Sequence, residues 1–296
     1  MTDPDTAPSV ADHNPQLDND RLRFDGIRRL YGGRAAEAFR QAHVVVVGVG
    51  GVGSWAVEAL ARSGIGRLTL IDLDDVCLSN VNRQLHALDG TVGRPKVEVL
   101  AERCRLIAPD IDVVADVAFA TPTNLAERIP ADADHVVDAI DSVVAKAALI
   151  AYCKRRKLPI TVTGAAGGQT DPTRIQVADL TRTHQDPLLA SVRARLRRDF
   201  GFSRNPKRRF SVPCVYSDEQ MVYPGADGEV CRQKPDDGES TRLDCESGFG
   251  AATFLTGTFG FVAASQALAK LAKSTRNRDE KPAMSAAFKA TSENST

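Results

Sequence analysis

A glycine-rich segment between two apolar runs constrains the fold more than any other part of this 296-residue chain. The β-branched run at residues 44–47 is typical of a strand buried on both faces of a parallel sheet. Glycines follow, then a helical pattern up to Arg62, and then a second apolar run at 67–71 that ends before Asp72. We therefore predict a strand, a tight turn, a helix and a second strand, an order typical of nucleotide-binding α/β proteins.

The residues of the tight turn and the acid after the second strand predict the nucleotide site itself. Gly48, Gly50, Gly51 and Gly53 let the backbone turn sharply and approach a phosphate, and free N–H groups at the helix start favour an anion. Asp72 falls where an acidic side chain binds ribose hydroxyls in such folds. The fingerprint alone does not distinguish NAD from ATP.

The polar loop that follows, residues 73–96, is too long for an ordinary connection, and long loops in compact domains are usually functional. Its candidate nucleotide-binding residues are Asp74, Asn80, Arg83, Gln84 and Lys96. A guanidinium and an ammonium neutralise the charge of a triphosphate, whereas a nicotinamide site has no need of them. The loop therefore favours ATP.

Further apolar runs alternate with helical patterns along the chain. Strands are expected at 112–117, 135–140, 159–163 and 174–180, and helices at 95–107 and 143–156. This alternation predicts a Rossmann-like, doubly wound and mostly parallel sheet. Asp141 follows one of these strands, where it is suited either to holding Mg²⁺ on the phosphates or to capping the helix that begins at residue 143.

The chain divides into four segments by composition. We predict a disordered tail at 1–20, an ATP-binding domain at 21–180, a C-terminal substrate or dimer region at 181–273 and a mobile tail at 274–296. The third segment contains a basic helix, an irregular loop and a long apolar helix. Its uncharged stretch, 247–269, is rich in small residues, which favours a buried or dimer-interface helix over peripheral membrane association.

Composition limits the cellular setting and the cofactors. Basic and acidic residues balance at 38 each, so no overall field favours nucleic acid. The six cysteines form no CxxC pair and no signal peptide precedes them, a pattern typical of a reduced cytoplasmic protein. A structural zinc is not expected, because four-cysteine sites usually use closely spaced pairs.

The ordered motifs at 48–53, 72–76, 79–84, 93–96 and 138–142 resemble those of the ubiquitin-activating-enzyme-like adenylating superfamily. The resemblance covers about residues 22–180 and implies attack of a carboxylate on the α-phosphate of ATP–Mg²⁺. By position, it assigns ribose binding to Asp72, phosphate binding to Asn80 and Arg83, stabilisation of the developing charge to Lys96, and Mg²⁺ to Asp141. In an oxidoreductase or a non-catalytic nucleotide-binding module, Arg83, Lys96 and Asp141 would have no function.

Within that superfamily the chain resembles the tRNA threonylcarbamoyladenosine dehydratase subgroup from about residue 22 to 273. The segments that carry this likeness are 148–153, 164–173, 185–188, 222–224 and 244–253. The resemblance implies adenylation of the threonylcarbamoyl carboxylate on the adenosine beside the anticodon, ring closure by the side chain's own nitrogen, and release of AMP. The alternative is an adenylyltransferase for a small sulfur-carrier protein, which would usually carry the missing CxxC pairs.

The resemblance also bears on partners. It implies a homodimer, but where many members carry an arginine and a glutamine that reach the neighbouring nucleotide, this chain has Gly26 and Ile27. Arg23 or Arg29 would have to substitute. Binding of a monovalent cation stays open.

If the substrate is a tRNA, the basic block 193–209 is expected to contact its phosphates. The alternative is that this block is a solvated surface. The candidate phosphate contacts are Arg193, Arg195, Arg197, Arg198, Lys207, Arg208 and Arg209. Cys231 lies between basic residues, which makes a thiol more reactive. It is either an inert loop thiol or, as the family's link to cysteine-desulfurase sulfur relays implies, a point where a partner presents sulfur.

Overall fold

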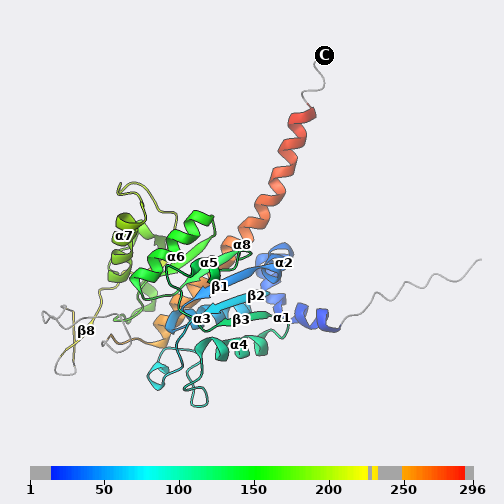
Figure 1. Ribbon diagram of the computed structural model, residues 1–296. Coiled ribbons are helices and arrows are strands. Elements are labelled where there is room, and N and C mark those ends of the chain that lie inside the picture. The colour runs from blue at the N-terminus through cyan, green and yellow to red at the C-terminus, as the bar shows by residue number, and fades with distance from the viewer. Residues whose placement is uncertain (1–14, 226–228, 233–248, 291–296) are drawn as a thin grey trace, which may run out of the picture.

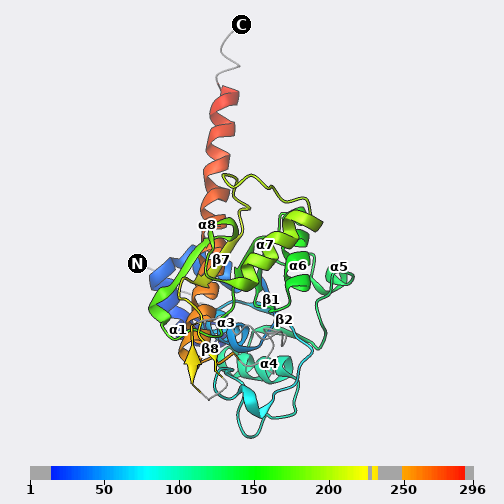
Figure 2. The ribbon, with the colours of Figure 1, turned by 90° about the vertical axis from the view of Figure 1, so that its left-hand side faces the viewer.

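The computed structural model describes residues 15–225, 229–232 and 249–290, and Figures 1 and 2 show it from two sides. One seven-stranded sheet forms its centre, with the strand order β3-β2-β1-β4-β5-β7-β6. The strands are β1 (His43–Val47), β2 (Arg67–Ile71), β3 (Asp112–Asp116), β4 (His135–Asp138), β5 (Ile160–Thr163), β6 (Ile175–Asp179) and β7 (Pro213–Ser217). All neighbouring pairs are parallel except β6 and β7. The predicted mostly parallel sheet is confirmed.

Helices cover both faces of the sheet. One face carries α2 (Gly33–Gln41), α3 (Gly51–Arg62), α4 (Lys96–Ile107) and α8 (Thr253–Ala290), and the other carries α6 (Val143–Arg156) and α7 (Pro187–Asp199). In β1, Val44 and Val46 pack in the first layer, whereas Val45 and Val47 pack in the second. This alternation explains the unbroken β-branched run, because a central strand has no solvent-facing side.

The remaining elements are short or peripheral. They are α1 (Pro15–Tyr31), α5 (Leu125–Arg128), the two-residue strands β8 (Tyr223–Pro224) and β9 (Val230–Cys231), and 3₁₀ turns at Leu78–Asn80, Pro172–Arg174 and Leu180–Arg182. The helix α1 begins inside the segment 1–20, for which the sequence predicted disorder. The segment 274–296, predicted to be mobile, contains the last part of α8.

The sheet does not end at residue 180. The strand β7 lies between β5 and β6, and β6 is an antiparallel edge strand. The sequence indicated a strand at 174–180 without its direction and left 210–216 unassigned. Because β7 belongs to the same sheet as β1–β5, the regions predicted as 21–180 and 181–273 share one core.

The helix expected at 247–269 begins later, at Thr253, and continues to Ala290. It packs along α3, and a Cβ added at Gly260 would lie 2.6 Å from the Val52 carbonyl oxygen. The glycine therefore lets the two helix backbones approach closely. Within the described residues, no helix has the length and apolar character needed to cross a membrane.

This close approach predicts a stability effect within α8. Gly260→Ala should lower the free energy of unfolding by about 1–3 kcal/mol, because the added methyl overpacks the contact with α3. Gly257→Ala is the matched control: its Cβ would lie 3.7 Å from the Trp55 ring, an ordinary contact, and alanine favours a helix by about 1 kcal/mol. Denaturant unfolding of both variants measures the difference. Equal stabilities would contradict the close packing.

Candidate active site

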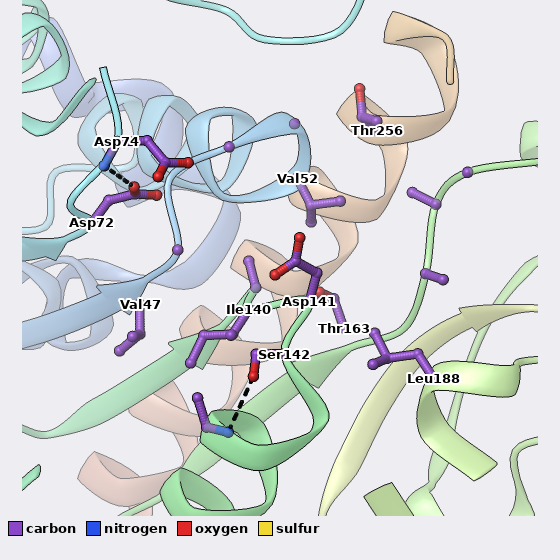
Figure 3. Close-up of a pocket in the computed structure, with 18 of the residues that line it drawn as sticks. Val47, Val52, Asp72, Asp74, Ile140, Asp141, Ser142, Thr163, Leu188 and Thr256 are labelled. Atoms are coloured by element: carbon purple, nitrogen blue, oxygen red, sulfur yellow. Dashed lines mark hydrogen bonds between the residues drawn. The ribbon is translucent and has the colours of Figure 1, made fainter. Parts of the chain in front are cut away.

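A cavity of about 760 Å³ opens at the carboxyl ends of β1, β2, β4 and β5. This is where open α/β sheets bind ligands. In Figure 3, Asp141 lies between Asp72 and Asp74 on one side and Thr163 and Leu188 on the other. The cavity therefore has two ends, and Asp141 stands between them.

The glycine-rich turn after β1 forms one wall. Gly48 has φ +82°, and a Cβ there would lie 2.9 Å from the Ala139 carbonyl group. Gly50 and Gly51 also line the cavity, next to the start of α3. Gly53, predicted to bind the nucleotide, is not among the lining residues; a side chain there would overlap the Gly48 carbonyl oxygen. Its place in the structure is a packing position that shapes the turn.

Asp72 extends from the end of β2 into the cavity wall. Its carboxylate accepts hydrogen bonds from the backbone N–H groups of Val49, at 2.8 Å, and Asp74, at 2.9 Å. Burial raises the pKa of this carboxyl despite those bonds. Each oxygen has a further lone pair, so Asp72 holds the glycine-rich turn and still has capacity for hydroxyl donors.

Lys96 is the cation at this end of the cavity. Its side chain is only 7% exposed, and its Nζ lies 2.7 Å from Oδ2 of Asp74, whose side chain is 55% exposed. Both residues line the cavity. The ammonium is therefore fixed in position by a partly solvated carboxylate rather than by a buried one.

The loop before α4 carries the other predicted phosphate ligands. Arg83 and Gln84 line the cavity. The buried Asn80 does not: its Oδ1 accepts a hydrogen bond from the Cys77 backbone N–H at 3.1 Å, so in this structure it stabilises the loop. Ser79 and Asn82, which the sequence did not single out, line the cavity instead.

Two distant helices hold this loop in place. The Arg83 carbonyl accepts hydrogen bonds from Trp55 Nε1 on α3, at 3.1 Å, and from Thr256 Oγ1 on α8, at 3.0 Å. Asn82 donates to the Ala251 carbonyl at 2.7 Å. The start of α8 therefore determines where Arg83 stands, which the sequence could not reveal.

Asp141 follows β4, and its neighbour Ser142 caps α6. The Ser142 hydroxyl accepts the hydrogen bond from the Ala145 N–H, at 3.5 Å. The alternative role of Asp141 as the cap is therefore wrong, and its exposed carboxylate faces the cavity.

A fully buried ion pair supports the turn that carries Asp141. Lys146 Nζ lies 2.9 Å from Oδ1 of Asp138, and neither side chain is exposed. The same carboxylate oxygen accepts the Ile140 N–H at 3.0 Å. Burial raises the pKa of the Asp138 carboxyl, and the adjacent ammonium opposes that rise. Truncating one partner of such a pair is strongly destabilising, so the pair fixes the geometry of the turn.

Small residues form the opposite end of the cavity. They are Thr163, Gly164, Ala165, Ala166, Gly167, Gly250 and Ala251, together with Leu188, Met221 and Phe249. Asp186 caps α7 and also accepts the Ala165 N–H at 3.0 Å, which ties the loop after β5 to that helix. The Gly168 N–H donates to the Gly250 carbonyl at 2.8 Å. Two segments far apart in sequence thus make one wall.

The predicted tRNA contacts fall into two groups. The Arg193 guanidinium donates to the Leu180 carbonyl and the Thr183 hydroxyl, so it is occupied inside the chain. Arg195 and Arg198 pair with Asp199, at 3.3 and 2.7 Å, and Arg197 lies over the Phe210 ring, at 5.6 Å.

By contrast, Lys207, Arg208 and Arg209 are exposed in the loop after α7. Arg198 on α7 is also 65% exposed, but it pairs with Asp199. The structure therefore places further exposed cations in the loop at the end of the basic block.

The N-terminal arginines considered for a dimer contact are occupied within the chain. Arg23 donates to the Ile107 carbonyl at 2.7 Å, and Arg29 pairs with Asp25.

Cys231 is partly exposed and lies on β9, opposite Tyr223. Cys245 falls outside the described residues. Among the residues described, no three His, Cys, Asp or Glu side chains cluster in a way that would hold a metal ion.

His86 gives the site a pH-dependent stability. It is buried, and neither ring nitrogen has a hydrogen-bond partner in the described structure. Burial, together with Lys96, lowers its pKa from 6.5 to about 4. The unfolded state therefore binds the extra proton first, and the contribution of neutral His86 is lost as pH falls from about 6.5 towards 4.

We expect this residue to account for about 2 kcal/mol of the stability lost between about pH 7 and about pH 5. His86→Leu removes no hydrogen bond and should flatten the curve by that amount, as urea unfolding at both pH values would show. His135, whose pKa burial lowers to about 3, keeps its own contribution in the variant. An unchanged pH dependence would contradict the assignment.

Comparison with known proteins identifies the family of this chain. The profile of the ThiF family matches residues 25–294. A tRNA threonylcarbamoyladenosine dehydratase of Escherichia coli (strain K12) is 56% identical over 257 residues, which cover 86% of this chain and 96% of that protein.

Solved structures lead to the same family. The E. coli tRNA N6-threonylcarbamoyladenosine dehydratase in complex with ATP superposes with a TM-score of 0.77 at 53% identity, covering 86% of this chain and 96% of that one. Its complex with AMP superposes with a TM-score of 0.77 at 50% identity, covering 91% and 100%. This chain belongs to the ThiF family.

Proposed function

We propose that this protein uses ATP to dehydrate threonylcarbamoyladenosine in tRNA, closing the side chain into a ring. The observation that carries the proposal is the placement of Arg83, Lys96 and Asp141 around one cavity whose far wall is built from small residues. The E. coli relatives named for this reaction, with their ATP and AMP complexes, support it.

The nucleotide would occupy the end of the cavity formed by β1 and β2. Asp72 would accept hydrogen bonds from the ribose hydroxyls. The backbone at Gly50 and Gly51 begins α3, where N–H groups favour phosphate. Gln84 lines the cavity and its buried Oε1 has no hydrogen-bond partner in the described structure. It is thus available to accept a donor from a bound molecule.

The cationic side chains stabilise the charge that moves during adenylation. The substrate carboxylate oxygen forms a bond to the α-phosphorus, and the bond to the pyrophosphate oxygen breaks. Lys96, held by Asp74, and Arg83 neutralise the negative charge on the phosphates; such fixed charges act most strongly where water is excluded. Asp141 fits Mg²⁺, which usually binds one or two carboxylates together with substrate phosphates; that ion would neutralise phosphate charge.

The small-residue wall leaves room for the acceptor nucleoside. Ring closure then needs no cysteine: the side-chain nitrogen bonds to the activated carbonyl carbon, the bond from that carbon to the AMP oxygen breaks, and the nitrogen loses its proton. The reaction is intramolecular, so proximity contributes much of its rate. The net change in the nucleoside is the loss of one water.

We also infer that the protein is a homodimer, and as a second hypothesis that Cys231 takes part in sulfur transfer. Phe254 and Phe261 lie seven positions apart on α8 and are 54% and 49% exposed, so they present an apolar face that a second copy would cover. Cys231 is partly exposed, which suits an encounter with a cysteine-desulfurase partner.

The decisive experiment is ATP–pyrophosphate exchange with three acceptors: tRNA carrying threonylcarbamoyladenosine, unmodified tRNA and a small sulfur-carrier protein. Exchange with only the modified tRNA, and a nucleoside lighter by one water on mass spectrometry, is expected. Exchange with the carrier protein alone would favour the adenylyltransferase alternative. No exchange with any acceptor would reject both.

A further inference from the structure

A second recess lies at the opposite end of the sheet from the ATP cavity. It has a volume of about 320 Å³ and is lined by Asp134 and Pro159, which precede β4 and β5, and by Arg156, Lys157 and Lys270. The first cavity lies at the carboxyl ends of those strands. Since α6 runs from one cavity to the other over 14 residues, the two are about 21 Å apart.

Basic residues of α6 and α8 border this recess, and a hydrogen bond links them to a third basic segment. Residues 154–157 at the end of α6 are all basic, and Lys270 joins them from α8. The Lys154 ammonium donates to the Ser211 carbonyl at 3.3 Å, which brings in the loop after α7 with its exposed Lys207, Arg208 and Arg209. Figures 1 and 2 both show this loop at the end of the molecule where α8 leaves the body. We call residues 154–157, Lys270 and the loop 204–209 the amino-edge basic surface.

The acids near this surface are already engaged. The Asp134 carboxylate accepts the His43 N–H at 2.9 Å, and Asp132 pairs with Arg67 at 2.9 Å. On α7, Arg195 and Arg198 pair with Asp199, Arg193 donates to internal acceptors, and Arg197 lies over the Phe210 ring. The basic side chains of the surface outnumber these two acids, and like-charged side chains gathered together repel one another. A polyanion would relieve that repulsion.

We propose that the amino-edge basic surface binds the sugar-phosphate backbone of the tRNA, about 20 Å from the nucleoside being modified. The proposal rests on the proposed function, which places the modified adenosine in the ATP cavity. Along a nucleic acid duplex, 20 Å corresponds to many phosphates, since duplex DNA carries about one charge per 1.7 Å. The tRNA would then contact both ends of α6, with the loop in the cavity and the stem on the basic surface.

A triple variant tests the surface without touching the cavity. Arg155→Ala/Lys157→Asn/Lys270→Ala removes three charges; asparagine is chosen because residue 157 has φ +57°, which asparagine tolerates. Arg155→Lys/Lys157→Arg/Lys270→Arg keeps the charges and is the matched control. The binding of full-length modified tRNA is followed by fluorescence anisotropy across a salt series.

The charge-removing variant should bind full-length tRNA about tenfold more weakly at low salt, and the slope of log affinity against log salt should fall by about 2. The charge-keeping variant should bind like the wild type. Equal affinity and slope in all three proteins would overturn the proposal, as would equal weakening in both variants. A variant that loses binding to anionic phospholipid vesicles but not to tRNA would assign the surface to a membrane instead.

A short oligonucleotide separates this inference from the proposed function. A few nucleotides around the threonylcarbamoyladenosine cannot span from the cavity to the recess, so ATP–pyrophosphate exchange with that oligonucleotide should be equal in the wild type and both variants. If the wild type supports no exchange with either the oligonucleotide or full-length modified tRNA, the proposed function fails. If exchange with the oligonucleotide is intact and the tRNA salt slope is unchanged in the charge-removing variant, only the surface assignment fails.

Discussion

Replacing Lys96 with alanine should reduce ATP–pyrophosphate exchange by about 10²- to 10³-fold, the usual loss when one fixed stabilising group is removed from a reaction centre. The fold should persist, because the partner left behind, Asp74, is half exposed and remains hydrated. The backbone N–H of Lys96 would still donate to the Asp74 carbonyl, at 3.0 Å, so the start of α4 is unaffected. Exchange kinetics and thermal unfolding measure the two expectations.

A matched variant separates the loss of the cation from the exposure of an acid. The alternative explanation of a loss in Lys96→Ala is that the unpaired Asp74 carboxylate repels phosphate. Lys96→Ala/Asp74→Asn removes both charges and should remain as inactive as the single variant. Asp74→Asn alone keeps the ammonium and should retain far more activity. Recovery of exchange in the double variant would show that Lys96 serves only to neutralise Asp74.

The parts of the fold that depend on local patterns could be predicted from the sequence. The strand β1 follows from its β-branched run, since Val44 to Val47 face helices on both sides. The bounds of α6 match the prediction because Ser142 caps its start and Lys157 ends it in the left-handed conformation. The direction of β6 had no local signal, because the sequence pattern of a strand is similar in a parallel and in an antiparallel pair.

The candidate site was only partly predictable for a related reason. Asp and Ser are comparable helix caps, so the sequence could not say which of Asp141 and Ser142 would cap α6. Asn80 carries the family motif, yet its side chain here bonds to the Cys77 N–H. The small-residue wall joins the loop after β5 to residues 249–251, and nothing local indicates that these segments meet. Tertiary packing decides such contacts.

Replacing Asp141 with asparagine should reduce exchange by about 10²-fold or more and raise the Mg²⁺ concentration needed for half-maximal exchange by at least about tenfold. The amide keeps the shape of the side chain but removes the negative charge that a divalent cation requires. Because Ser142 rather than Asp141 caps α6, the unfolding free energy should not change.

The neighbouring residue provides the control for that prediction. Ser142→Ala removes the cap of α6 and should lower the unfolding free energy by about 1 kcal/mol, while the Mg²⁺ dependence of exchange stays that of the wild type. The two substitutions, one position apart, thus separate binding of the metal from stability of the helix. An Asp141→Asn variant with the wild-type Mg²⁺ requirement would exclude this carboxylate as the metal ligand. The ion would then have to be held by the phosphates and another carboxylate at the cavity; among the residues that the structure describes, the remaining choices are Asp72 and Asp74.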